Sequence, residues 1–129
     1  MTTMGDVVTA ALKRLRVINA RKTPDGISAS DGLVALNDMM HSWKGVGVNT
    51  DHETLESADD FPLDEEHVQG VKALLAVRLS SDYGLEVNQG IVRDADMGWQ
   101  AIMAEFVEPA ASPVFDGGLI NTTMGRDGM

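Results

Sequence analysis

Carboxylates gathered in one part of the chain are the first groups whose chemistry needs an explanation. The acids of residues 51–66, a stretch without lysine or arginine, are Asp51, Glu53, Glu56, Asp59, Asp60, Asp64, Glu65 and Glu66. Two of the acids between Asp59 and Glu66 would serve as the carboxylate pair of a glycoside hydrolase. A solvated loop that leads into the positive N-terminus of a helix explains the same residues more simply. We therefore predict no catalytic residue here.

The other groups capable of site chemistry do not form a recognisable motif. His41, His52 and His67 are not at ligand spacing on a common helix, and residues 52–56 lack the second histidine of a His-Glu-x-x-His site. The chain has no cysteine, which excludes thiolate metal sites and disulfides. It also lacks a phosphate-binding glycine loop and a Gly-x-Ser-x-Gly elbow. We predict no metal, no cofactor and no enzymatic activity.

Charge is strongly segregated along the sequence. The net charge is −10, yet half of the ten basic residues lie in residues 13–22, as Lys13, Arg14, Arg16, Arg21 and Lys22. We call these five residues the basic face. The acidic face is the group Asp51, Glu53, Glu56, Asp59 and Asp60. We predict that the basic face of one copy contacts the acidic face of the next, and that an acidic protein lets DNA pass without binding it tightly.

Apolar residues at three- and four-residue steps predict four helices, and therefore an all-α, four-helix bundle-like domain. The first is expected over 4–18, after a capping box of Thr3 and Asp6. The second begins at a capping box of Ser28 and Asp31 and stops at the glycines of 45–47. The third runs from about residue 64 to 83, before Gly84. The fourth spans 87–107.

Residues 74–79 carry apolar side chains on more than one side of the third helix, which indicates a central position. We predict a core that includes Trp43, Leu74, Leu75, Leu79, Ile91, Ile102 and Phe106. Residues 48–63 are irregular and acidic, with a short hairpin or an extended arm as the alternatives. No apolar stretch has the length of a signal peptide or a membrane span, so we expect assembly in a cytoplasm and no membrane partner.

Residues 108–129 have no helical periodicity and contain two prolines and four glycines. We predict that they form an extended C-terminal tail on a helical domain of residues 1–107. The apolar residues of this tail are Val114, Phe115, Leu119 and Ile120. They are candidate anchors for a partner protein, whereas a frayed terminus is the simpler alternative.

Three segments, in this order and spacing, resemble the tail accessory factors of short-tailed phages. They are the start of the first helix at 5–12, residues 33–48 with the run Trp43-Lys44-Gly45-Val46-Gly47-Val48, and residues 74–87. Such proteins are small helical adaptors that complete a DNA-filled head. The resemblance implies a dodecameric ring beneath the portal protein, in the virion at the head–tail junction.

The resemblance further implies that the C-terminal tail docks onto the portal, that the ring helps retain packaged DNA, and that it offers a platform for a downstream tail or nozzle protein. Genomic DNA would pass through the ring without tight binding. Two other functions remain open at this point. One is a virion-associated peptidoglycan hydrolase, and the other is a bacterial helical-bundle regulator that binds a protein partner.

Overall fold

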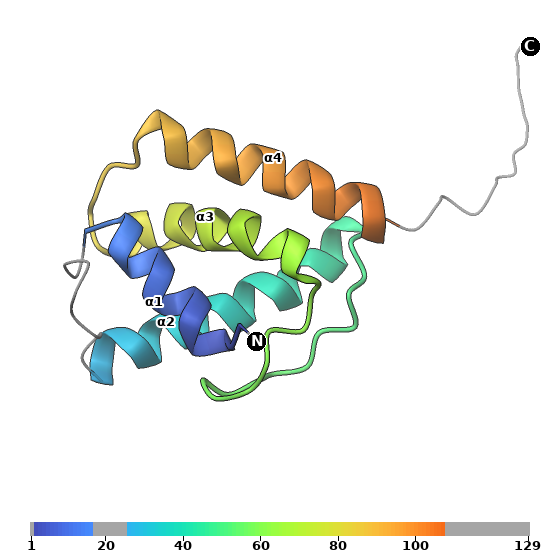
Figure 1. Cartoon of the computed structure of the whole chain (residues 1–129), viewed down its shortest axis with the longest axis horizontal. Coiled ribbons are helices and arrows are strands. Elements are labelled where there is room, and N and C mark those ends of the chain that lie inside the picture. The colour runs from blue at the N-terminus through green and yellow to red at the C-terminus, as the bar shows by residue number, and fades with distance from the viewer. Residues whose placement is uncertain (1, 17–25, 108–129) are drawn as a thin grey trace, which may run out of the picture.

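The computed structural model describes residues 2–16 and 26–107, which form four α-helices and one 3-10 helix (Figure 1). The elements are α1 (Met4–Arg14), α2 (Gly26–Ser42), η1 (Trp43–Val46), α3 (Glu65–Asp82) and α4 (Gln89–Phe106). The described residues contain no strand, and only isolated bridges join Thr3 to Asp60 and Val48 to Val107. The predicted all-α class is confirmed.

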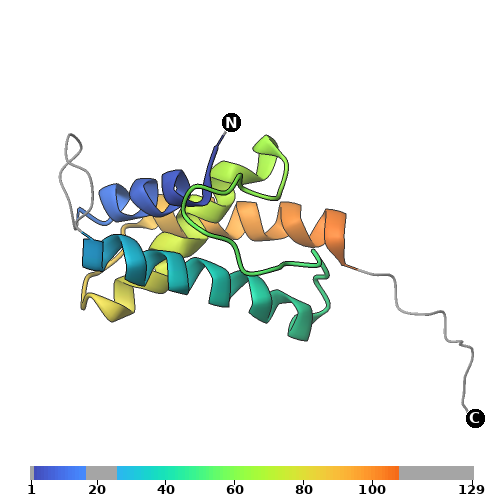
Figure 2. The ribbon, with the colours of Figure 1, turned by 90° about the horizontal axis from the view of Figure 1, so that it is seen from below.

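Helix α3 lies at the centre and contacts each of the other three α-helices. Figures 1 and 2 show α4 along one side of α3, with α1 and α2 on the other. This position explains the apolar residues on several sides of α3, because Val68, Val71, Leu75 and Leu79 are buried along with Ala73 and Ala76. None of the helices in the described ranges has the length and hydropathy needed to span a bilayer.

The core contains most of the residues predicted for it. Trp43, Leu75, Leu79, Ile91 and Ile102 are buried. Leu74 and Phe106 are only half-buried, and they pack against the edge of the core. Phe106 is the last residue of α4, where fewer neighbours surround a side chain than at the middle of the bundle. Methionine fills much of the remaining interior, as Met4, Met39 and Met40 show.

Helix α1 starts as predicted but ends early. The Asp6 N–H donates to Thr3 Oγ1 at 3.1 Å, and the Thr3 N–H donates to Asp6 Oδ2 at 3.0 Å, which completes the capping box. The helix stops at Arg14, so the predicted extension to residue 18 is wrong. Arg16 has a φ of +62°, and this left-handed conformation cannot continue a right-handed helix.

Two other helix ends test the sequence patterns. Helix α2 begins at Gly26, so Ser28 lies inside its first turn and the predicted start at Ser28 and Asp31 is wrong. Helix α3 ends as predicted, because Gly84 has a φ of +64°. The Leu85 N–H then donates to the Ser80 carbonyl at 2.9 Å, a bond typical of a glycine-terminated helix.

Residues 47–64 form an irregular arm that is attached at both ends. Near its start, the Asn49 N–H donates to the Phe106 carbonyl at 3.3 Å, beside the Val48–Val107 bridge. Near its end, the Phe61 N–H donates to the Thr2 carbonyl at 2.9 Å, and the Met4 N–H donates to the Asp59 carbonyl at 2.9 Å. Of the two predicted alternatives, the structure therefore shows the extended arm and no hairpin.

Two glycines let α3 and α4 approach each other closely. A Cβ built on Gly70 of α3 would lie 2.6 Å from the Gly98 Cα of α4, and one built on Gly98 would lie 2.4 Å from the Gly70 Cα. These distances are shorter than any contact that real side chains make. The two backbones touch at this point, which lets α4 lie directly on the central helix.

Candidate functional site

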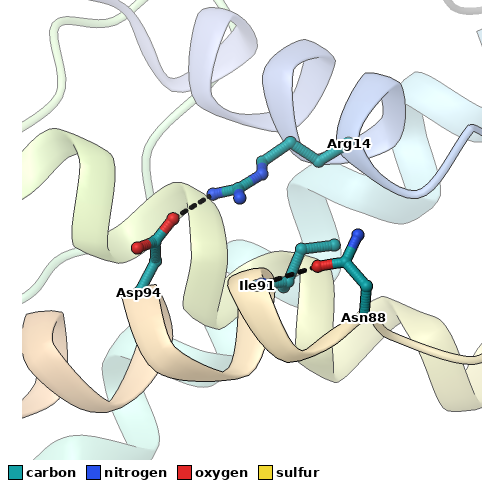
Figure 3. A network of polar contacts seen from close by, with 4 residues as sticks. All are labelled: Arg14, Asn88, Ile91 and Asp94. Atoms are coloured by element: carbon teal, nitrogen blue, oxygen red, sulfur yellow. Dashed lines mark hydrogen bonds and ion pairs between the residues drawn. The ribbon is translucent and has the colours of Figure 1, made fainter.

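The described part of the basic face lies at the end of α1, and one of its residues is already paired within the chain. The Arg14 Nη1 is 3.0 Å from Asp94 Oδ2 on α4 (Figure 3). The two side chains are 35% and 49% exposed, so this ion pair contributes at most about 1 kcal/mol. Lys13 and Arg16 form no ion pair with any described residue. Arg21 and Lys22 lie outside the described residues.

The position of Asp94 depends on the start of α4. Asn88 is the N-cap residue, and its Oδ1 accepts a hydrogen bond from the Ile91 N–H at 2.9 Å (Figure 3). Such a cap satisfies one of the backbone donors that a helix leaves free in its first turn. Asp94 lies in the following turn of the capped helix, where its carboxylate meets Arg14.

The acidic face lies on the arm of residues 47–64, and all five of its side chains are exposed. Two local hydrogen bonds shape this part of the arm. The Glu56 N–H donates to Asp59 Oδ2 at 2.7 Å, and the Asp51 N–H donates to Asn49 Oδ1 at 3.1 Å. No ion pair joins the acidic face to the basic face within the described residues. Contact between the two faces of different copies stays a prediction.

A buried amide, which the sequence analysis missed, holds the arm against α2. Asn37 is 6% exposed, and its Oδ1 accepts from the Leu55 N–H at 3.0 Å and from His52 Nε2 at 2.9 Å. Its Nδ2 donates to the carbonyls of Leu55 at 2.9 Å and Leu33 at 3.2 Å. The side chain thus uses two donors and two acceptor sites. The sequence does contain a signal for this buried amide, because Asn37 interrupts an apolar pattern between Leu36 and Met39.

Two histidines meet beside this amide. The rings of His41 and His52 are 4.8 Å apart in an edge-on arrangement, at a surface pocket of about 380 Å³. Each Nε2 has a protein partner, Thr54 Oγ1 for His41 and Asn37 Oδ1 for His52, so the two rings do not share a metal-binding point. Burial, followed by the proximity of His41, lowers the pKa of His52, while Glu53 acts in the opposite direction.

The third histidine links α3 to α4. His67 is 3% exposed, and its Nε2 lies 2.8 Å from Glu105 Oε1 and 3.7 Å from Glu66 Oε1. A metal-binding histidine almost always donates its other ring nitrogen to an acceptor. The Nδ1 of His67 is buried and has no hydrogen-bond partner. We therefore interpret this cluster as a hydrogen-bonded pair between the two helices.

The described residues form a small helical domain with charged surfaces. A family model described as P22 tail accessory factor matches residues 1–112, which include all four helices. The chain belongs to the P22 tail accessory factor family. It is therefore a phage virion head–tail protein. No curated protein matches the chain.

Membership of the P22 tail accessory factor family confirms the resemblance carried by residues 5–12, 33–48 and 74–87. This is a family of structural phage proteins. The whole predicted tail domain 108–129 of this tail accessory factor lies outside the described residues, including the predicted portal-docking residues Val114, Phe115, Leu119 and Ile120.

Proposed function

We propose that this tail accessory factor is a non-enzymatic adaptor that forms a ring under the portal protein. In that position it helps retain the packaged DNA and provides a platform for a downstream tail or nozzle protein. The observation that carries the proposal is the family match over residues 1–112. Exposed charge of both signs on separate elements supports it, because complementary faces steer copies into the head-to-tail contact that a ring needs.

The absence of enzymatic activity is part of this proposal. A peptidoglycan hydrolase would need two carboxylates free to act on a substrate. Two of the candidate acids instead have roles in the fold: Asp59 accepts the Glu56 N–H, and Glu65 accepts the Thr2 hydroxyl at 3.0 and 3.1 Å. These hydrogen bonds hold the arm of 47–64 and the N-terminal residues, which supports a structural function for the acids.

We further propose that residues 108–129 dock onto the portal while residues 1–107 remain a separate domain. The last described residues support this division, since Phe106 and Val107 are held by Asn49 and Val48 of the arm. The tail therefore starts from a fixed point on the domain. Several copies in a ring would offset the weak binding of each tail by raising its effective concentration.

The test compares two changes in the tail. Removal of residues 109–129 should leave the circular dichroism spectrum of the helical domain unchanged in shape and abolish pull-down of the purified portal protein. A variant with Val114, Phe115, Leu119 and Ile120 replaced by serine should behave like the truncation. The matched control replaces the polar residues Asn121, Thr122 and Thr123 by serine or alanine and should still bind. Portal binding by the truncated protein would contradict the docking role.

A further inference from the structure

A groove of about 580 Å³ lies between α2 and the C-terminal end of α3. Three exposed carboxylates line it, those of Asp31, Asp38 and Asp82, against one guanidinium, that of Arg78. None of these four groups forms an ion pair with a described residue. The groove is therefore a concave surface with an excess of negative charge, separate from the acidic face on the arm.

The groove also offers apolar contact. Val34, on its wall, is 57% exposed, although it is a large hydrophobic residue in the middle of α2. The half-buried ring of Tyr83 lies at the same site. The aliphatic stems of lysine and arginine bury well against such surfaces, and a guanidinium is attracted to an aromatic face. The chemistry of the groove therefore fits a basic side chain with a long stem.

Basic residues of this kind lie at and just beyond the end of α1. Figure 2 shows α1 on one side of α2 and the C-terminal end of α3 on the other. Lys13 lies in the last turn of α1 and the exposed Arg16 lies two residues beyond its end, and neither is in an ion pair with a described residue. Complementary charges on different elements of one chain suit a head-to-tail contact between copies.

We propose that the groove between α2 and α3 receives Lys13 and Arg16 of a neighbouring copy of this chain. This inference rests on the proposed ring and names its contact surface. In this contact, the partner of Lys13 and Arg16 is the set of groove carboxylates Asp31, Asp38 and Asp82, and not the acidic face on the arm. The groove is favoured because it combines negative charge, a concave shape and an exposed apolar side chain. The arm of 47–64 has the charge, and Asp51 and Glu53 line a pocket there, but none of the exposed large hydrophobic residues lies on it.

Cross-linking between single-cysteine variants tests the contact, because the chain has no cysteine of its own. Arg16→Cys carrying a mass tag is mixed with untagged Asp38→Cys and treated with a short bismaleimide, in the presence of portal protein. We expect a mixed dimer. Glu53→Cys replaces Asp38→Cys in the matched control and should give at least about tenfold less product. Equal or greater cross-linking through Glu53→Cys would overturn the inference in favour of the acidic face.

Charge reversal provides a second test. Lys13→Glu with Arg16→Glu should weaken association between copies by about tenfold or more, since like charges then face each other. Adding Asp31→Lys and Asp38→Lys to the same chain should restore it. If the wild-type protein associates and both variants associate equally well, the groove contact is wrong and the ring itself is not contradicted. Wild-type protein that never associates, alone or on the portal, would overturn the proposed ring together with this inference.

Discussion

Asn37 is the residue that most directly connects the arm of 47–64 to the helices. Four hydrogen bonds converge on its buried side chain, from Leu55, His52 and Leu33. Their geometry fixes the proton positions: because Oδ1 is the acceptor, His52 donates from Nε2. The Nδ1 of His52 is then a buried acceptor without a partner. One polar residue inside α2 thus anchors the middle of a surface arm whose two ends are held by backbone hydrogen bonds.

Asn37→Leu should therefore destabilise the protein more than its size suggests. The substitution leaves the Leu55 N–H and the carbonyls of Leu33 and Leu55 without their side-chain partner, at a cost of about 2–3 kcal/mol in the free energy of unfolding. Urea denaturation gives this value. Asp38→Leu, at the exposed neighbouring position, is the control and should change stability by about 0.5 kcal/mol or less. Equal effects of the two changes would refute the role of Asn37.

The same network predicts a pH dependence. Burial and His41 lower the pKa of His52 below its ordinary value of 6.5. The unfolded chain therefore takes up a proton at a higher pH than the folded protein does. The contribution of His52 to stability is complete above pH 6.5 and is lost as the pH falls below 6.5 through the lowered pKa.

Thermal unfolding at about pH 8 and about pH 5.5 measures this effect, with a lower Tm expected at the acidic pH. The control is His52→Gln, which does not titrate but keeps an N–H donor for Asn37 Oδ1. Its Tm should fall by less than that of the wild-type protein between the two conditions. If the Tm of His52→Gln falls by as much as that of the wild-type protein, other groups cause the pH dependence.

At the scale of the elements, the contact between α3 and α4 depends on two glycines that face each other. Gly98→Ala would place a Cβ 2.4 Å from the Gly70 Cα, so the helices must move apart. We expect a loss of about 1–3 kcal/mol, measured by urea unfolding. Gly45→Ala is the matched control, because its Cβ would meet nothing within 4 Å. A Gly98→Ala protein as stable as Gly45→Ala would mean that the two helices do not touch there.

The elements also show what the sequence can predict. The middles of the helices follow from apolar periodicity, and the Thr3 and Gly84 signals correctly mark two ends. The end of α1 was missed because a left-handed arginine at position 16 has no sequence signature, unlike a glycine. The start of α2 was misplaced because Ser28 and Asp31 form a capping pattern that can equally lie inside a helix.

At the scale of the whole molecule, the charged surfaces depend on pairs that are distant in sequence. Arg14 meets Asp94, and His67 meets Glu105, across interfaces that only the packing of α4 creates. The sequence predicted the two charged runs but not these pairs, since periodicity does not show which helices are neighbours. It also did not predict the groove, because Asp31, Asp38 and Asp82 come from two helices.

The overall charge leads to a prediction about DNA. A protein with a net charge of −10, in which Arg14 is neutralised by Asp94, presents little surface for phosphates. We expect the dissociation constant for duplex DNA near physiological salt to be above about 1 μM, because the proposed ring must let a genome slide past it. Fluorescence anisotropy with a labelled duplex measures it, and Asp94→Asn, which releases Arg14, should bind no more weakly. Submicromolar binding by the wild-type protein would contradict the prediction.

The most direct test of the proposed function is the mass of the complex that the full chain forms with the purified portal ring. Size-exclusion chromatography with light scattering gives this mass, and the same run without portal gives the mass of the chain alone. The proposed adaptor predicts a closed complex with a fixed number of copies per portal ring, which does not grow as more protein is added. A portal ring that elutes without bound protein, or a complex that grows without limit, would contradict it.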